Sequence, residues 1–202
     1  MPGYRRAIVV ASATVMAGAL IIVGSRLASA DGPNITTLST AVFDASTSAV
    51  WSGAEVTGAS AYDTATLGGL VNGTVPTGTV TYTLFSDSGC TMSPTTEQVT
   101  LDSSGNVPDS SPTVALAASS YSYQATYSGD SFYSQSTSSC EPFTVLAANS
   151  TINTTVDDAL TNGPWDGTEQ TGASAYDTAG VGGVAGFAPT GSVTYDFFAN
   201  ST

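Results

Sequence analysis

Carboxylates are the only plentiful side chains in this chain that could carry acid–base or metal chemistry. The 202 residues include 16 Asp and Glu, 3 Lys and Arg, and no His. Two carboxylates held about 5 to 10 Å apart can hydrolyse a glycosidic bond, and clustered carboxylate oxygens can bind Ca²⁺. The candidates are Asp157 and Asp158 as a hydrolytic pair, and Asp63 with Glu55 and either of those acids as a calcium site at a domain junction.

The simpler interpretation gives these acids structural roles. Adjacent residues of a strand point to opposite faces, which separates Asp157 from Asp158, and no D-x-D-x-D loop surrounds Asp63. Asp63 falls on the apolar face of an alternating segment. Because buried carboxylates are normally hydrogen-bonded, we expect Asp63 to lie near one end of the fold and to accept backbone N–H bonds there. We predict no enzyme, no bound metal and no cofactor.

The first thirty residues differ in kind from the rest. A positively charged start, MPGYRR, precedes an apolar run and the A-x-A pattern of Ala28–Ala30. This order predicts a secretory signal peptide over residues 1–30 and a secreted or cell-surface protein. The apolar run is long for a signal peptide, so an uncleaved membrane anchor stays open as the alternative.

Basic side chains are confined to that segment. Arg5, Arg6 and Arg26 all lie within it, and all 16 acids follow it. The exported chain would therefore contain no Lys, Arg or His. Their absence excludes nucleic-acid binding and attachment to anionic lipid, which need cations. It also excludes His-activated nucleophiles, Lys-dependent phosphate cradles and His-ligated zinc.

The two cysteines, Cys90 and Cys140, suit an oxidising compartment. We expect one disulfide between them, with two free or intermolecular thiols as the alternative. In the chain-entropy model, closing a loop of roughly fifty residues contributes about 3 to 4 kcal/mol. The cysteines flank strands whose ends could lie far apart, so the bridge requires the segment SDSGCTM to fold back.

Part of the sequence occurs twice. The stretch TGASAYDT occupies residues 57–64 and returns unchanged at residues 171–178, and Trp51 recurs as Trp165. The two copies are 171 − 57 = 114 residues apart. This spacing is too long for a solenoid repeat and predicts whole domains in tandem.

The domain boundaries follow from the spacing between the two copies. We expect a first domain at residues 31–147 and the N-terminal half of a second at residues 148–202. PTGTVTYTLF (76–85) has a counterpart in PTGSVTYDFF (189–198), whereas the strands that close the first unit have none. We therefore expect the natural protein to continue past residue 202 and residues 148–202 alone not to fold as a stable monomer.

Short alternating segments indicate strands, and the exported chain shows no helical period. TVTYTLF puts Val80, Tyr82 and Leu84 on one face, and YSYQATY does the same with its tyrosines. About seven short strands separated by turn signals predict an all-β fold, a two-sheet β-sandwich. Further strands are expected at Thr37–Asp44, Ala59–Leu67, Glu97–Leu101, Thr113–Leu116 and Glu141–Leu146.

Three blocks within Pro76–Val145, PTGTVTY, LAASSYSYQATYSGDSFY and FTV, together resemble the bacterial immunoglobulin-like repeat domains of secreted and surface proteins. The resemblance implies an immunoglobulin-like β-sandwich that serves as a modular spacer or display domain. In cysteine-bearing variants of that family, one cysteine follows the TYTLF-type strand and another precedes the last strand. Cys90 and Cys140 stand at those two places.

Aromatic residues allow a second kind of site. Trp51 and Trp165 could stack on sugars, but a tryptophan kept at the same place in each copy more often packs against the core or the joint between domains. We expect packing. The stripe of Tyr121, Tyr123 and Tyr127 is explained by the alternation of a sheet face.

The expected function is a non-enzymatic extracellular immunoglobulin-like repeat module, acting as a stalk, spacer or adhesin-like scaffold. Its expected partners are neighbouring repeats of the same longer chain, with cell-wall or host-surface ligands as further candidates. The alternative is a module that itself recognises a glycan or host protein through loops at one end. A binding end should differ between copies, whereas the pattern WxGxExTGASAYDT is kept.

Overall fold

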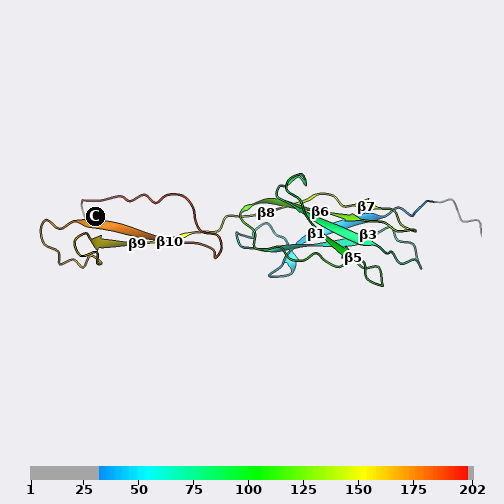
Figure 1. Ribbon diagram of the computed structural model, residues 1–202, viewed down its shortest axis with the longest axis horizontal. Helices are drawn as coiled ribbons and strands as arrows, with labels where there is room; N and C mark the ends of the chain where they lie inside the picture. The colour runs from blue at the N-terminus through cyan, green and yellow to red at the C-terminus, as the bar shows by residue number, and fades with distance from the viewer. Residues whose placement is uncertain (1–31, 200–202) are drawn as a thin grey trace, which may run out of the picture. The chain divides into compact units, whose positions relative to one another are not determined.

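The computed structural model of the protein describes residues 32–199 (Figure 1). Every regular element in that range is a strand and every ladder between strands is antiparallel, which confirms the all-β prediction. The predicted signal peptide lies outside the described residues. The strands are β1 (Thr37–Asp44), β2 (Ala49–Val50), β3 (Ala61–Gly68), β4 (Thr79–Phe85), β5 (Thr95–Thr100), β6 (Ser119–Tyr127), β7 (Ser136–Thr137), β8 (Glu141–Val145), β9 (Thr151–Asp158) and β10 (Ala175–Gly182).

The first eight strands form two sheets. In the three-stranded sheet β1 lies between β2 and β3. In the five-stranded sheet the order is β5-β4-β6-β7, and β8 also pairs with β6. Contacts of β1 with β6 and β8 bring the two sheets together, and these strands lie alongside one another in Figure 1.

The two sheets share a core because alternate side chains of each point toward the other. One cluster joins Leu38 of β1 to Tyr82 and Tyr127 of the other sheet. A second joins Val42 of β1 to Phe143 of β8. Burying an apolar or aromatic side chain of this size stabilises the fold by about 1.5 to 3 kcal/mol.

One predicted strand, Thr113–Leu116, is wrong; the others are present with ends within two residues of the predicted ones. Residues 110–116 run along the free edge of β3 and of the residues just before it, but their N–H groups donate only at three-residue intervals. Ser110 donates to Asp63, Thr113 to Ala61 and Leu116 to Ala59. A strand bonds its neighbour at every second residue, and Pro112 has no N–H to give. The segment still covers an edge that would otherwise be open to pairing.

β9 and β10 have the geometry of β1 and β3 displaced along the chain by 114 residues. The displacement takes Thr37 to Thr151, and it takes each Cα pairing of the first hairpin to one of the second. The glycine turns agree as well, since φ is +84° at Gly53 and +83° at Gly167. The copied sequence is therefore accompanied by copied backbone conformation and register.

Residues 189–198 match β4 in sequence but form no strand. β4 is hydrogen-bonded on both sides, by β5 and β6. The part of the chain that the structure describes has no counterpart of those two strands, so the alternating segment has no ladder to join. Apolar side chains of the second hairpin accordingly stay exposed: Ile152 by 55%, Val156 by 49% and Val181 by 44%.

One carboxylate ties the YSGD turn after β6 to the PTG loop before β4. Asp130 accepts hydrogen bonds from Thr77 N–H (2.8 Å) and Oγ1 (3.0 Å). It also accepts them from the N–H groups of Phe132 (2.7 Å) and Tyr133 (2.8 Å). Burial alone raises the pKa of Asp130, but these hydrogen bonds outweigh it and hold that pKa below its ordinary value. Gly129 precedes it at φ +73°, where a Cβ would meet backbone atoms at 2.8 Å.

Replacing Asp130 by Ala is expected to lower the free energy of unfolding by about 2 kcal/mol at pH 7, because several N–H groups lose their acceptor. Because the pKa of Asp130 is lower in the folded protein than in the unfolded chain, the carboxylate stabilises the fold fully at pH values above the ordinary Asp pKa. This stabilisation is lost as the pH falls through the lowered pKa. Urea unfolding of the wild type and the variant at pH 7 and pH 3 measures the loss of stability and its dependence on pH. Asp102→Ala is the matched control, since Asp102 bonds only Ser104 and Asn106 in its own turn. Equal losses in the two variants would contradict the prediction.

Candidate functional site

A disulfide joins Cys90 to Cys140, with their Cα atoms 5.9 Å apart. Cys90 lies in the loop between β4 and β5, and Cys140 directly precedes β8. The bridge therefore connects one end of the five-stranded sheet to its last strand. This confirms the predicted pairing of the two cysteines.

The loop that carries Cys90 folds back over β6, as the bridge requires. Ser122 of β6 accepts a hydrogen bond from the Cys90 N–H (3.1 Å) and donates one to the carbonyl of Asp87 (2.6 Å). Ser122 is fully buried, although it belongs to the outward-facing set of the strand. The Asp87 carboxylate holds the loop further, through Thr91 and Met92, and a side-chain bond from Thr91 leads the causes that lower the Asp87 pKa. Sequence reasoning missed Ser122, because a serine among alternating polar residues gives no sign of burial.

Among residues 32–199, Asp63 is the one acid in the buried class. It is 0% exposed and shares the inward face of β3 with Ala61 and Ala65. Its backbone N–H donates to Ser110 Oγ (2.8 Å), but neither carboxyl oxygen has a hydrogen-bond partner among the described residues. The prediction that this carboxylate accepts backbone N–H bonds is wrong. Sequence alternation located the residue correctly, but it could not show whether a hydrogen-bond donor reaches the buried carboxyl.

Burial, with a smaller contribution from the charge of Glu141, raises the pKa of Asp63 to about 8. The carboxyl is therefore protonated at neutral pH. Burial, followed by the proximity of Asp63, also raises the pKa of Tyr82, and burial raises that of Tyr123. A carboxyl of this kind avoids the cost of an unpaired buried charge only while it keeps its proton.

A groove of about 310 Å³ lies between the five-stranded sheet and residues 110–116, lined in part by Tyr82, Ser110 and Tyr123. Two of the polar side chains that line it are already hydrogen-bonded. Tyr82 Oη donates to the Pro108 carbonyl (3.0 Å). Glu97 on its wall accepts bonds from the N–H and hydroxyl of Ser111, at 2.8 and 2.7 Å. Glu97 is the one acid among the lining residues, so the groove holds no carboxylate pair.

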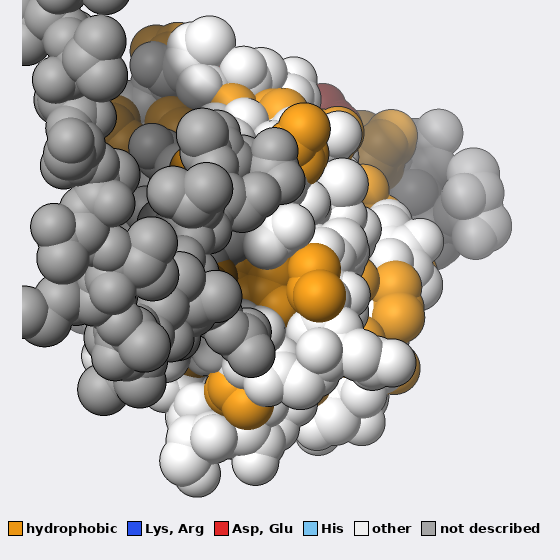
Figure 2. Space-filling view, turned by 90° about the vertical axis from the view of Figure 1, so that its right-hand side faces the viewer, with side chains coloured by type: hydrophobic (Ala, Val, Ile, Leu, Met, Phe, Trp, Pro, Cys, Tyr) orange, Lys and Arg blue, Asp and Glu red, His pale blue; other side chains and the backbone are white. Residues whose placement is uncertain are grey.

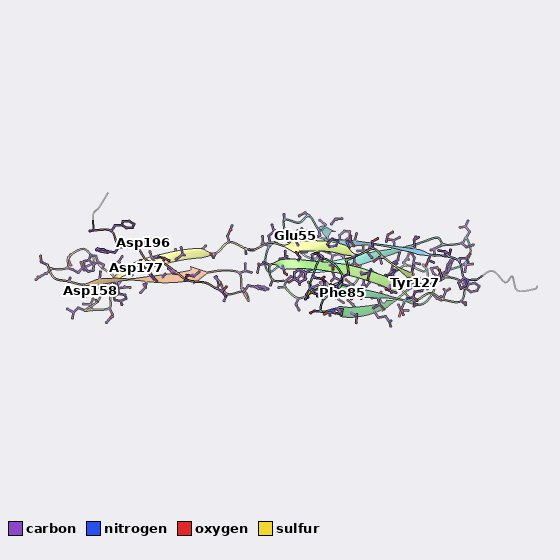
Figure 3. The ribbon with its side chains drawn as sticks, turned by 90° about the horizontal axis from the view of Figure 1, so that it is seen from above. Glu55, Phe85, Tyr127, Asp158, Asp177 and Asp196 are labelled. Atoms are coloured by element: carbon purple, nitrogen blue, oxygen red, sulfur yellow. A yellow bond between two sulfur atoms is a disulfide. The ribbon has the colours of Figure 1, made fainter. Side chains whose placement is uncertain are left out.

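The acids proposed for calcium or hydrolysis serve separate local structures. Glu55 accepts bonds from Ser52 and Gly53 in its own loop. Asp158 bonds the backbone of the turn that follows it, and Asp157 accepts a bond from Thr178. Residues 32–199 hold no group of three or more acids, cysteines or histidines that could bind a metal. Figure 3 shows Glu55 on the first part of the chain and Asp158, Asp177 and Asp196 on the second.

Trp51 packs as expected. Its ring meets Phe143 edge-on, with ring centroids 5.0 Å apart, and its Nε1–H donates to the carbonyl of Thr144 (3.0 Å). Tyr121 and Tyr123 stack on the same Phe143. Trp165, the counterpart of Trp51, is 37% exposed.

No family model, curated protein or solved structure matches this chain. Within residues 32–199, the structure contains no helix with the length and apolar character needed to cross a membrane. The same range carries no Lys, Arg or His. Figure 2 shows one face of the molecule, in which scattered hydrophobic side chains lie among backbone and other uncharged side chains, with an acidic side chain near the top.

Proposed function

We propose that this protein is a non-enzymatic extracellular chain of tandem immunoglobulin-like β-sandwiches, acting as a stalk or spacer or as an adhesin-like scaffold. In this proposal residues 31–147 are the first domain and residues 148–202 begin the second. Residues 1–30 direct export. The partners are neighbouring domains of the same kind.

The observation that carries the proposal is the duplicated hairpin. β9 and β10 keep the register of β1 and β3 over eight residue pairs in each ladder. The loop is kept too: Trp51 N–H donates to Val42 C=O and Trp165 N–H to Val156 C=O, both at 2.8 Å. Duplicated local structure supports modules added in series, each with its own core, which lengthen a chain without a new fold.

Two further features support the sandwich and its location. Both hydrophobic clusters contain side chains from the two sheets, so the sheets share one core. Within the five-stranded sheet, the disulfide joins the loop between β4 and β5 to the residue before β8. The pairing of the only two cysteines suits an oxidising compartment. The resemblance of Pro76–Val145 to bacterial immunoglobulin-like repeats agrees with both. A chain with 16 acids and no base after residue 30 would keep such arrays soluble and mutually repelling.

A surface-display experiment tests the proposal. The chain is expressed with an epitope tag after residue 202, and antibody access to intact cells is measured before and after residues 32–147 are replaced by an unrelated disulfide-bonded sandwich of similar length. A spacer predicts equal access for both chains. Binding of the original chain to cells or glycans that is lost after the replacement would instead indicate a ligand-recognition module.

A further inference from the structure

The loop between β3 and β4 contains an asparagine followed by a glycine. Asn72 and Gly73 are the central residues of a turn closed by a hydrogen bond of 3.2 Å from Thr74 N–H to Val71 C=O. Both are exposed, and a Cβ added to Gly73 would meet no atom within 4 Å. Neither the Asn72 side chain nor the Gly73 N–H has a hydrogen-bond partner among residues 32–199. No hydrogen bond therefore restrains either group.

The duplicated part of the chain makes the same turn without an asparagine. A hydrogen bond of 2.9 Å between the first and last residues closes the turn at residues 184–187. Its glycine, Gly186, has φ +83°, against +85° at Gly73. Ala185 precedes this glycine, at the place that Asn72 has in the first turn. The turn therefore forms without the side chain of an asparagine.

A buried tyrosine fastens both ends of the first turn. Tyr133 is 0% exposed, and its Oη accepts the N–H of Val71 at 3.0 Å and donates to the carbonyl of Thr74 at 2.8 Å. Its ring belongs to the core cluster that contains Leu38 and Tyr82. A change in backbone length between Val71 and Thr74 would therefore disturb hydrogen bonds made from the core.

We propose that Asn72 is a site of spontaneous deamidation, and that the isoaspartate formed there releases the turn from Tyr133. The Gly73 nitrogen gives its proton to hydroxide and attacks Cγ of Asn72. A bond from this nitrogen to Cγ forms, the bond from Cγ to Nδ2 breaks, and ammonia leaves a five-membered succinimide ring. Water then opens the ring at either carbonyl, which gives aspartate or isoaspartate. The attack requires the peptide unit between the two residues to rotate, and a glycine without a Cβ permits this rotation.

The two products differ in what they do to the turn. Isoaspartate adds one CH₂ to the backbone between Val71 and Thr74, so the two groups that Tyr133 bonds cannot both keep their places. A buried hydroxyl that loses a partner destabilises the fold. Aspartate leaves the backbone unchanged and adds only an exposed negative charge. This inference rests on the turn and its chemistry, and it stands even where the proposed spacer role fails.

The other Asn-Gly pair in residues 32–199, Asn162 and Gly163, is hydrogen-bonded at both groups. Asn162 Oδ1 accepts a bond from Tyr176 Oη, and Gly163 N–H donates to Thr161 Oγ1, both at 3.3 Å. Asn162 also has φ +55°, whereas Asn72 is not among the residues with positive φ. We therefore expect Asn162 to react more slowly than Asn72.

Mass spectrometry of residues 31–202 during incubation at pH 7 and 37 °C tests the proposal. This range has no Lys or Arg for trypsin, so the reduced protein is cut after aromatic residues, and the peptide 63–82 then contains Asn72 as its one asparagine. We expect this peptide to gain about one mass unit, the difference between an amide and an acid, at least tenfold faster than the peptide with Asn106. Asn106 is the internal control, because its side chain donates to Asp102 at 2.9 Å and a β-branched residue follows it.

Two variants test the effect on the turn. Asn72→Ala should keep the turn, as Ala185 does in the second copy, and its melting temperature should stay constant during incubation. Asn72→Asp should melt with fresh wild type. Deamidated wild type, separated by anion exchange, should melt about 5 °C lower, because part of it carries isoaspartate. Equal rates for the peptides with Asn72 and Asn106 would overturn the proposal, as would deamidated protein that melts together with Asn72→Asp.

Discussion

Between pH 5 and pH 8 the protein is expected to lose about 3 to 4 kcal/mol of its free energy of unfolding, and Asp63→Asn is expected to abolish most of that loss. The pKa of Asp63 is about 8 in the folded state against an ordinary 3.8, and this difference sets the direction in which stability changes with pH. The folded state holds a proton on Asp63 that the unfolded state has released. Stability is therefore full at low pH and declines as the pH rises toward 8.

This pH window is unusually free of other titrations. Residues 31–202 include no His, Lys or Arg. The exposed acids with shifted pKa values, such as Asp44, Asp87 and Asp102, are shifted downward by local hydrogen bonds and stay ionised above pH 5. A change in the free energy of unfolding with pH between pH 5 and pH 8 can therefore be assigned to Asp63, because few other groups titrate in this range.

Urea unfolding at half-unit pH steps measures the effect. The wild-type profile should fall with a slope approaching 1.4 kcal/mol for each pH unit, about the value for one proton, and the Asp63→Asn profile should be nearly flat. Asp102→Asn is the matched control and should keep the wild-type slope. A flat wild-type profile would show that water or backbone rearrangement solvates Asp63 and would contradict the buried, unpaired placement.

Loss of the Cys90–Cys140 bridge is expected to lower the free energy of unfolding by about 3 to 4 kcal/mol and the melting temperature by about 10 to 15 °C. The bridge closes a loop with a sequence separation of 50 residues, so its removal frees much of the unfolded chain. It also releases the loop that Ser122 holds over β6.

Calorimetry of the oxidised protein, the reduced protein and the Cys90→Ser/Cys140→Ser variant measures the loss. Ser122→Ala in the oxidised protein separates the loop contacts from the covalent bond and should cost about 1 to 2 kcal/mol. Rapid alkylation of both cysteines in the native protein would contradict the bridge itself.

The strands could be predicted from sequence because alternation reports burial directly. β1 was placed at its observed bounds, since TLSTAVFD alternates between a packed face and an outer one. Thr113–Leu116 failed because the composition of a strand does not reveal hydrogen bonds spaced by three residues. The two-residue strands β2 and β7 carry too little pattern to be found at all.

The sites were less predictable, because their properties depend on what lies across the core. The pattern placed Asp63 on an apolar face, but alternation does not report which donors surround a buried side chain, so it could not predict that the carboxyl has no partner. Trp51 was correctly expected to pack, although its partner Phe143 is far along the chain. Ser122 gave no signal, since its role exists only once the Cys90 loop has folded back.

Pulling on single molecules of the oxidised chain, residues 31–202, by its ends tests most directly whether it is a disulfide-clamped spacer. The account predicts one force peak from the cooperative rupture of β1 to β8. It also predicts that reduction lengthens the final extension by about 170 Å, the reach of the loop of 50 residues that the bridge encloses. Extension without a force peak, or the same final length in both redox states, would contradict it.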